Sequence, residues 1–144
     1  QIRAKDEQRN TLESQVFYAL QTVLVAHANL SEKEIEELDG LRGIDGENVR
    51  KRILRAVKSI SINDITEQFN SDIESRENIE LKDKSRFKTR TIGTFIRNLS
   101  FDTGKGSGNK SFLQSRDFFS AYRSCINAFG SRFDVDSGFD DKVS

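Results

Sequence analysis

The sequence contains no methionine, one cysteine and one histidine among its 144 residues. Cys125 cannot form a disulfide within the chain, so we expect a reducing, cytoplasmic environment. No apolar run approaches the roughly 18 residues of a membrane span, so no membrane partner is predicted. Because the chain begins at Gln1 and lacks methionine, we expect it to be a fragment of a larger protein.

Few side chains in this sequence could carry out catalysis. His27 lies on the apolar face of a helical pattern, which predicts a core or interface residue, and no second His or Cys is placed to complete a zinc site. Cys125 has no neighbouring histidine that would lower its thiol pKa. Acidic residues are scattered rather than paired. We therefore predict no enzyme activity, no metal and no cofactor for this chain. A catalytic domain could belong to the rest of the larger protein of which the chain is expected to be a fragment.

Charge is unevenly distributed along a chain whose formal net charge is zero. Residues 82–123 contain 10 basic and 3 acidic residues, whereas residues 1–81 contain 11 basic and 16 acidic ones. Residues 124–144 contain 2 basic and 4 acidic residues. A local excess of positive charge is typical of a nucleic-acid footprint, and it would also suit an acidic protein partner.

The first part of the chain is predicted to be helical. Apolar residues keep a helical period over residues 5–29, and this stripe could pack onto the rest of the domain or form a homo-oligomer. Packing is the favoured alternative. Ser31 and Glu34 form a capping-box pattern at the start of a second short helix, which leads into the glycine-rich loop 40–46. Residues 1–45 are therefore assigned to an N-terminal helical extension.

Residues 46–130 have the pattern of one compact, mainly α domain with a small β-hairpin. A helix is predicted before a short strand at 60–62, and a second short helix ends near Phe69. The polar connection 71–84 is expected to be an insertion or a partly mobile loop. Ser115 is predicted to cap a last helix that stops at Gly130, and residues 131–144 are assigned to an acidic tail. The predicted core contains Ile65, Phe69, Ile92, Phe95, Ile96, Leu99, Phe118 and Tyr122.

The stretch 86–113 combines an amphipathic helix, predicted over 86–99, with a basic hairpin over 101–113. On the helix, Ile92, Phe95, Ile96 and Leu99 have the spacing of a buried face. The opposite face is predicted to carry Arg86, Arg90, Thr94 and Arg97. The hairpin has Lys105 and Lys110 around a tip whose residues tolerate positive φ.

The segment 104–111, GKGSGNKS, is one residue away from a phosphate-binding loop motif, because Asn109 replaces the second glycine. That loop needs a buried strand before it and a helix directly after it. Here Ser100 to Thr103 precede it, and Phe112 and Leu113 are predicted to form a returning strand. The sequence therefore favours a hairpin over a nucleotide site.

The order helix, short strand, helix, helix, hairpin is that of a winged helix-turn-helix. Over about residues 47–129 the chain resembles the winged-helix modules appended to replicative helicases, primase–helicases and related mobile-element ATPases. The residues that carry this resemblance are Arg90, Ile92, Gly93, Ile96, Leu99 and Phe101, followed by the basic hairpin. The resemblance implies a module that serves DNA replication or a mobile element.

Two functions are consistent with these patterns. In the first, the domain binds double-stranded DNA through the helix 86–99 and the hairpin 101–113, with Arg86, Arg90, Thr94, Arg97, Lys105 and Lys110 as the contact residues. In the second, the same fold is a protein-interaction module that docks a partner subunit, and the first helix mediates oligomerisation.

Overall fold

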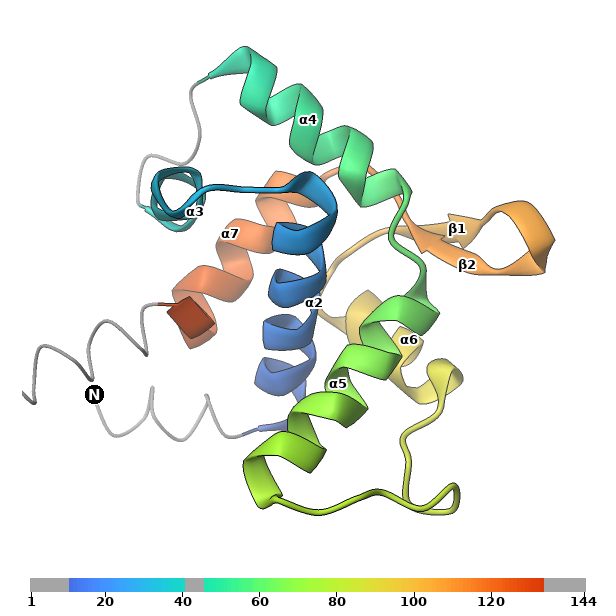
Figure 1. Cartoon of the computed structure of the whole chain (residues 1–144). Coiled ribbons are helices and arrows are strands. Elements are labelled where there is room, and N and C mark those ends of the chain that lie inside the picture. Colours follow the sequence, from blue (N-terminus) through green and yellow to red (C-terminus); the bar gives the residue numbers. More distant parts are fainter. Residues whose placement is uncertain (1–10, 41–45, 134–144) are drawn as a thin grey trace, which may run out of the picture.

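The computed structural model describes residues 11–40 and 46–133. Within these ranges it contains six α-helices and one two-stranded antiparallel hairpin, which projects from one side of the helices (Figure 1). The predicted fold class, mainly α with a small β-hairpin, is confirmed at this level. Residues 1–10, 41–45 and 134–144 lie outside the described residues, and so do the predictions that fall on them.

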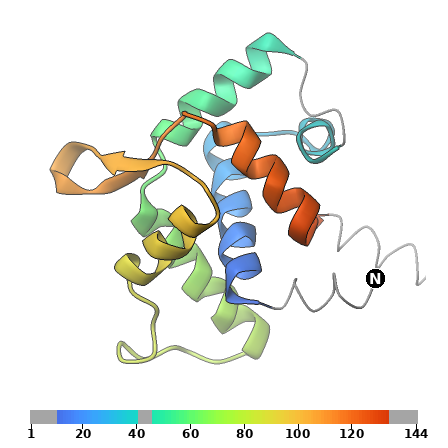
Figure 2. The same ribbon diagram turned by 180° about the vertical axis from the view of Figure 1, so that it is seen from behind.

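Helix α2 (Leu12–Ala28) lies at the centre of the molecule, with the other helices around it (Figures 1 and 2). Phe17, Leu20 and Leu24 are fully buried. Helices α4 (Glu47–Lys58) and α5 (Ile62–Glu77) both pack against it, and their buried residues belong to the same core cluster. The apolar stripe of this helix therefore serves packing within the chain. Although the sequence assigned α2 to an N-terminal extension, it shares its core with residues from 46–130.

Helix α3 (Glu32–Asp39) begins with the predicted capping box. The Ser31 hydroxyl accepts from the Glu34 backbone N–H at 3.2 Å, and the Glu34 carboxylate accepts from the Ser31 N–H at 3.0 Å. Its last residue, Asp39, accepts hydrogen bonds from the hydroxyls of Tyr122 at 2.6 Å and Ser131 at 2.5 Å. Burial, together with the Asp39 carboxylate, raises the pKa of Tyr122 well above its usual range. Tyr122 therefore keeps its proton and donates a hydrogen bond to Asp39.

Helix α5 is longer than the sequence predicted, and it takes up half of the connection 71–84. It continues to Glu77 because Ile73 is buried against the core, and it ends at Asn78, whose φ of 53° lies in the left-handed region. The prediction of an inserted or mobile loop over 71–84 is therefore wrong for its first half. A single residue of the connection, Ile73, supplies the apolar contact that extends the helix.

The hairpin consists of β1 (Thr103–Lys105) and β2 (Ser111–Leu113), joined by the short 3-10 turn Ser107–Asn109. Gly104 pairs with Phe112, so side chains alternate between the two faces of the hairpin. The Leu113 N–H donates to the Ile60 carbonyl at 3.0 Å, and Ser61 forms an isolated bridge with Phe112. The short strand expected at 60–62 is thus reduced to one bridging residue, which ties the hairpin to the start of α5.

Helix α7 (Phe118–Phe129) stops at Gly130, as predicted, where φ is 76°. It begins two residues after Arg116, and no side chain caps it, so the predicted cap at Ser115 is wrong. Asp117 takes this position with a left-handed φ of 56°. The chain therefore enters α7 through the left-handed backbone conformation of Asp117, and no side-chain hydrogen bond caps the helix.

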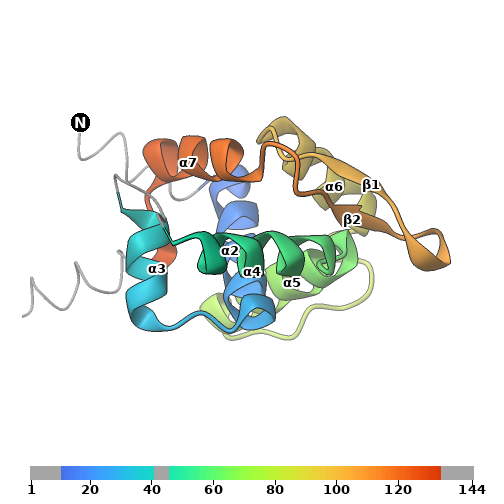
Figure 3. The same ribbon diagram turned by 90° about the horizontal axis from the view of Figure 1, so that it is seen from above.

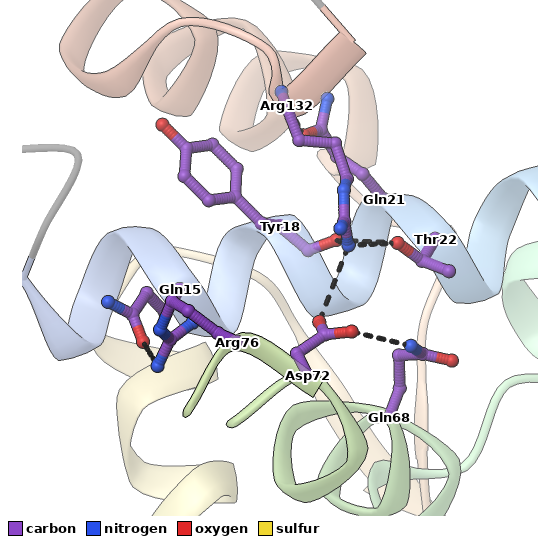
Figure 4. A network of polar contacts seen from close by, with 8 residues as sticks. All are labelled: Gln15, Tyr18, Gln21, Thr22, Gln68, Asp72, Arg76 and Arg132. Carbon is purple, nitrogen blue, oxygen red and sulfur yellow. Dashed lines mark hydrogen bonds and ion pairs between the residues drawn. The ribbon is translucent and has the colours of Figure 1, made fainter. Parts of the chain in front are cut away.

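Polar contacts hold the segment after α7 against α2 and α5 (Figure 4). The Arg132 guanidinium donates to the Thr22 hydroxyl and to the Tyr18 carbonyl, and it pairs with Asp72 at 3.3 Å. Asp72 also accepts from Gln68 at 2.8 Å. The first residues of the segment 131–144 are therefore fixed to the helices.

The predicted core is confirmed for seven of its eight residues, which are buried in one cluster with α2. Phe95 is half-buried and packs against the edge of that cluster. His27, which the sequence placed on an apolar face, is exposed, and its Nδ1 lies 3.0 Å from the Ser59 hydroxyl. The His27 side chain therefore lies at the edge of the core, beside the end of α4 and the start of α5.

Candidate nucleic-acid interface

A cleft of about 560 Å³ separates helix α6 from the hairpin. Its walls are formed by the first turn of α5, the exposed face of α6 and the second half of the hairpin, which stands beside α6 when viewed from above (Figure 3). The residues that line it are Ile62, Asn63, Thr89, Arg90, Gly93, Arg97, Asn109, Lys110 and Ser111. Three of these residues are basic and none is acidic, so the cleft is suited to an anion.

Helix α6 (Thr89–Asn98) presents one apolar and one polar face, as the sequence predicted. Ile92 and Ile96 are fully buried, whereas Arg90, Thr94 and Arg97 are exposed. No side chain caps the helix, and its first turn has no acidic residue. Its positive N-terminal end is therefore left without a neutralising carboxylate from the first turn, which favours an approaching anion.

Arg86 does not belong to this helix, contrary to the predicted range 86–99. The helix begins at Thr89, and Arg86 lies in the connection before it. Its guanidinium lies 3.4 Å from the Glu74 carboxylate of α5, and Arg86 does not line the cleft. The structure thus separates Arg86 from Arg90, Arg97 and Lys110, which line the cleft, and Thr94 is exposed on α6 without lining it.

The late start of α6 has a local cause in α5. The buried Asn70 side chain accepts from the Phe87 N–H at 2.9 Å and donates to the Phe87 carbonyl at 3.1 Å. This pair of hydrogen bonds uses the backbone groups of Phe87, so the residue stays outside the helix. Glu74 likewise accepts from the Leu81 N–H at 2.8 Å. Two side chains of α5 therefore fix the connection that sets the position of α6.

The hairpin brings one of its two lysines to the cleft. Lys110 lines the cleft, whereas Lys105 is exposed on the first strand, and its Nζ lies 3.3 Å from the Asn109 amide oxygen. The tip turns at Gly108, where φ is 69°, and no atom of the described residues lies within 4 Å of the position that a Cβ would occupy. At Gly106 a Cβ would lie 2.6 Å from the Phe112 ring, so glycine allows this ring to close over the hairpin.

None of the four basic residues Arg90, Arg97, Lys105 and Lys110 forms an ion pair with a carboxylate in the part of the chain that the structure describes. Their charges are therefore not neutralised from within the described residues. Arginine offers a planar fork of donors that fits a phosphate or the edge of guanine, and lysine offers a mobile point charge.

Polar residues around the cleft were missed by the sequence analysis. Asn63 accepts a hydrogen bond from the Thr89 hydroxyl at 3.2 Å, which joins the first turns of α5 and α6. Asn109 and Ser111 line the opposite wall. The sequence analysis did not single out Asn63, and it named Asn109 only as the residue that replaces the second glycine of a phosphate-binding motif. Their place beside the basic residues depends on tertiary packing that no local pattern reveals.

The structure bears on three other candidate sites: a phosphate-binding loop, the Cys125 thiol and a metal site. The segment 104–111 forms two strands and a tight turn, without the helix that a phosphate-binding loop requires. Burial raises the pKa of the Cys125 thiol to about 12, with a smaller contribution from Glu13. Within residues 11–40 and 46–133, no group of three or more His, Cys, Asp or Glu residues is placed to hold a metal ion.

No family model, curated protein or solved structure matches this chain. Among the described helices, none is long and apolar enough to cross a membrane. The geometry and the charge of the cleft are therefore the features that indicate a function.

Proposed function

We propose that this chain is a winged helix-turn-helix domain that binds double-stranded DNA, with α6 as the recognition helix and the β1–β2 hairpin as the wing. The strongest support is the cleft between them, which is lined by Arg90, Arg97 and Lys110 and by no acidic residue. Helix α6 has 10 residues and is about 15 Å long, and the diameter of an α-helix with its side chains, about 10–12 Å, fits a major groove of roughly 12 Å width.

The roles of the two elements follow from their chemistry. The exposed face of α6 contains arginine and threonine, which can donate to base edges as well as to phosphates. Lys105 and Lys110 stand on a hairpin with a small, glycine-containing tip, which suits contact with the backbone or the minor groove. Arg86, which the sequence included among the contacts, is assigned to positioning instead because Glu74 already pairs with it.

The cellular context is a proposal that rests on the sequence resemblance. A winged helix of this kind would serve a larger, cytoplasmic protein of DNA replication or of a mobile element. The DNA-binding domain would attach that protein to its duplex, and any catalysis would belong to another part of it.

Fluorescence anisotropy with a random-sequence duplex tests the proposal directly. Four to six phosphate contacts predict a slope of log K against log salt of roughly −4 to −5, measured between about 50 and about 200 mM salt. A double variant, Arg90→Ala with Arg97→Ala, should weaken binding while the melting temperature stays near that of the parent. A parent chain that shows no salt-dependent binding would contradict the proposal and favour the protein-interaction module.

A further inference from the structure

Helix α6 contains a glycine, Gly93, in the middle of the surface that faces the cleft. Glycine inside a helix is unfavourable relative to alanine because it loses more conformational freedom on folding. A requirement for positive φ does not explain it, since Gly108 and Gly130 are the glycines with positive φ in the described ranges. The reason must be sought in what a side chain at this position would meet.

The neighbours of Gly93 identify that reason. A Cβ built on Gly93 would lie 3.6 Å from the Ile62 side chain, an ordinary van der Waals distance, so packing between α5 and α6 allows alanine. The tighter contact, at 3.3 Å, is with a terminal nitrogen of the Arg97 guanidinium. A side chain at this position would therefore displace the Arg97 guanidinium by a few tenths of an ångström and leave the neighbouring helix in place.

Arg97 folds back over α6 in the space that Gly93 leaves. Its Nη2 donates to the Thr94 hydroxyl at 3.4 Å, and that hydroxyl in turn donates to the Arg90 carbonyl at 3.1 Å. The guanidinium is thus placed at the surface of the helix, in the cleft whose opposite wall carries Lys110. In the described part of the chain its other donors have no protein partner, so they are available to a ligand.

We propose that Arg97 and Lys110 form a phosphodiester site between α6 and the hairpin, and that Gly93 is the positioning residue that keeps this site open. The inference rests on the proposed DNA binding, and it assigns different contacts to the two arginines of α6. An arginine held against its own helix is suited to a backbone phosphate that enters the cleft, because its fork can bind two phosphate oxygens. Arg90, whose guanidinium has no such contact in the described residues, extends from the first turn toward base edges.

The test compares two glycine-to-alanine variants of the whole chain. Gly93→Ala should raise the melting temperature by about 2–4 °C, because alanine favours the helix and fits against Ile62. The same variant should bind a random-sequence duplex about 3- to 10-fold more weakly and lower the salt slope by up to about one unit. Gly46→Ala is the matched control, since among the described residues its Cβ would meet only Val49, at 3.7 Å, and Gly46 does not line the cleft.

Arg97→Ala separates the phosphate role from a base-reading role. It should weaken all duplexes alike, and it should leave the preference among sequences selected from a randomised duplex pool unchanged, whereas Arg90→Ala should relax that preference. In the Arg97→Ala background, Gly93→Ala should have no further effect on binding, because the two residues act as one unit.

Three results would overturn the site. These are a Gly93→Ala variant that binds as the parent does, additive losses for Gly93→Ala and Arg97→Ala, or a changed sequence preference in Arg97→Ala. Each of them leaves DNA binding itself intact. A parent chain that binds no duplex would overturn the proposed function and the phosphate site with it.

Discussion

Helices α4 and α6 are both strongly basic, yet their charges are used in different ways. Helix α4 contains five basic residues and α6 contains two. On α4, Lys51 pairs with Glu47 at 3.4 Å and Arg52 pairs with Glu34 at 2.5 Å. Arg50 lies over the Phe119 ring at 4.3 Å from its centroid. On α6, neither Arg90 nor Arg97 forms an ion pair within the described residues, and both face the cleft.

The comparison shows that the number of basic residues on a helix does not identify a binding surface. Helix α4 crosses one end of α2, and three of its cations are partnered by neighbouring side chains, whereas α6 lies alongside α2 with the hairpin beyond it (Figures 1 and 3). A concave surface and the lack of internal partners distinguish α6. A phosphate that approaches α6 would not have to displace a carboxylate of the described chain.

The largest expected effect is a loss of stability from substitutions on the buried faces of α4 and α6, where the two helices should behave alike. Ile53 on α4 and Ile96 on α6 are both fully buried. Each change to alanine should cost about 2–5 kcal/mol of unfolding free energy, because a cavity is left in the core. Chemical denaturation of Ile53→Ala and Ile96→Ala would measure it. A variant as stable as the parent would show that its helix is not anchored as described.

The next largest effect is a loss of duplex affinity from substitutions on the exposed face of α6, with the exposed face of α4 as the control. Replacing Arg90 and Arg97 by alanine should weaken duplex binding by about 2–4 kcal/mol in total, with little change in stability. The matched control replaces Arg55 and Lys58, two exposed cations of α4 that also lack an ion pair within the described residues. This control should change affinity far less. Equal losses for the two pairs would mean that charge alone, and not the cleft, governs binding.

The hairpin lysines should have a smaller effect, and it should be independent of sequence. Replacing Lys105 and Lys110 by alanine should weaken all duplexes alike and flatten the salt slope by about one unit for each phosphate that the variant no longer binds. Salt titrations of the variant and the parent would show the difference. If the slope is unchanged although the α6 pair matters, the hairpin takes no part in binding.

The smallest expected effect lies at the ion pair between α3 and α4. The pKa of the Glu34 carboxyl is lowered from 4.5, chiefly by its hydrogen bond with Arg52 and then by the Ser31 backbone. A carboxyl with a lowered folded pKa stabilises the fold above its unfolded value, and this contribution is lost as the pH falls through the folded pKa. Glu34→Gln retains a side chain suited to the capping box but removes the charge.

The melting temperature of Glu34→Gln should therefore lie slightly below that of the parent at neutral pH. The difference should disappear as the pH falls through the lowered pKa of Glu34, because the carboxyl is then protonated in the parent too. Parallel thermal melts across this range would check it. A gap that persists in acid would mean that the glutamate acts through packing rather than charge. DNA binding should not change, since this pair lies on α3 and α4, which do not line the cleft.

Local patterns predicted most of the elements, and tertiary contacts decided the rest. The capping box at Ser31, the stop at Gly130 and the apolar face of α6 were predictable because each depends on residues within one or two turns. The start of α6 was not, because Asn70 on another helix holds Phe87 outside it. The length of α5 was missed for a similar reason, since one buried residue, Ile73, carries the extension.

The sequence was sufficient to predict most of the basic residues of the candidate site, but not how they are arranged in space. Arg90, Arg97 and Lys110 share one cleft, which the amphipathic pattern and the hairpin pattern together suggested. Arg86 was included on the assumption that the helix began earlier, and the structure places it beside Glu74. The close approach of Gly93 and Arg97 could not be predicted, because the sequence does not reveal in which direction an arginine side chain extends.

The most direct measurement is a map of backbone amide signals by NMR as a duplex is added. The shifts are expected to concentrate on α6 (residues 89–98) and on the hairpin (residues 103–113), and then on the first turn of α5 beside them. Amides of α4 (residues 47–58) should move little, although that helix has more basic residues. Shifts centred on α4, or none at saturating duplex, would contradict the claim that the cleft between α6 and the hairpin is the binding surface.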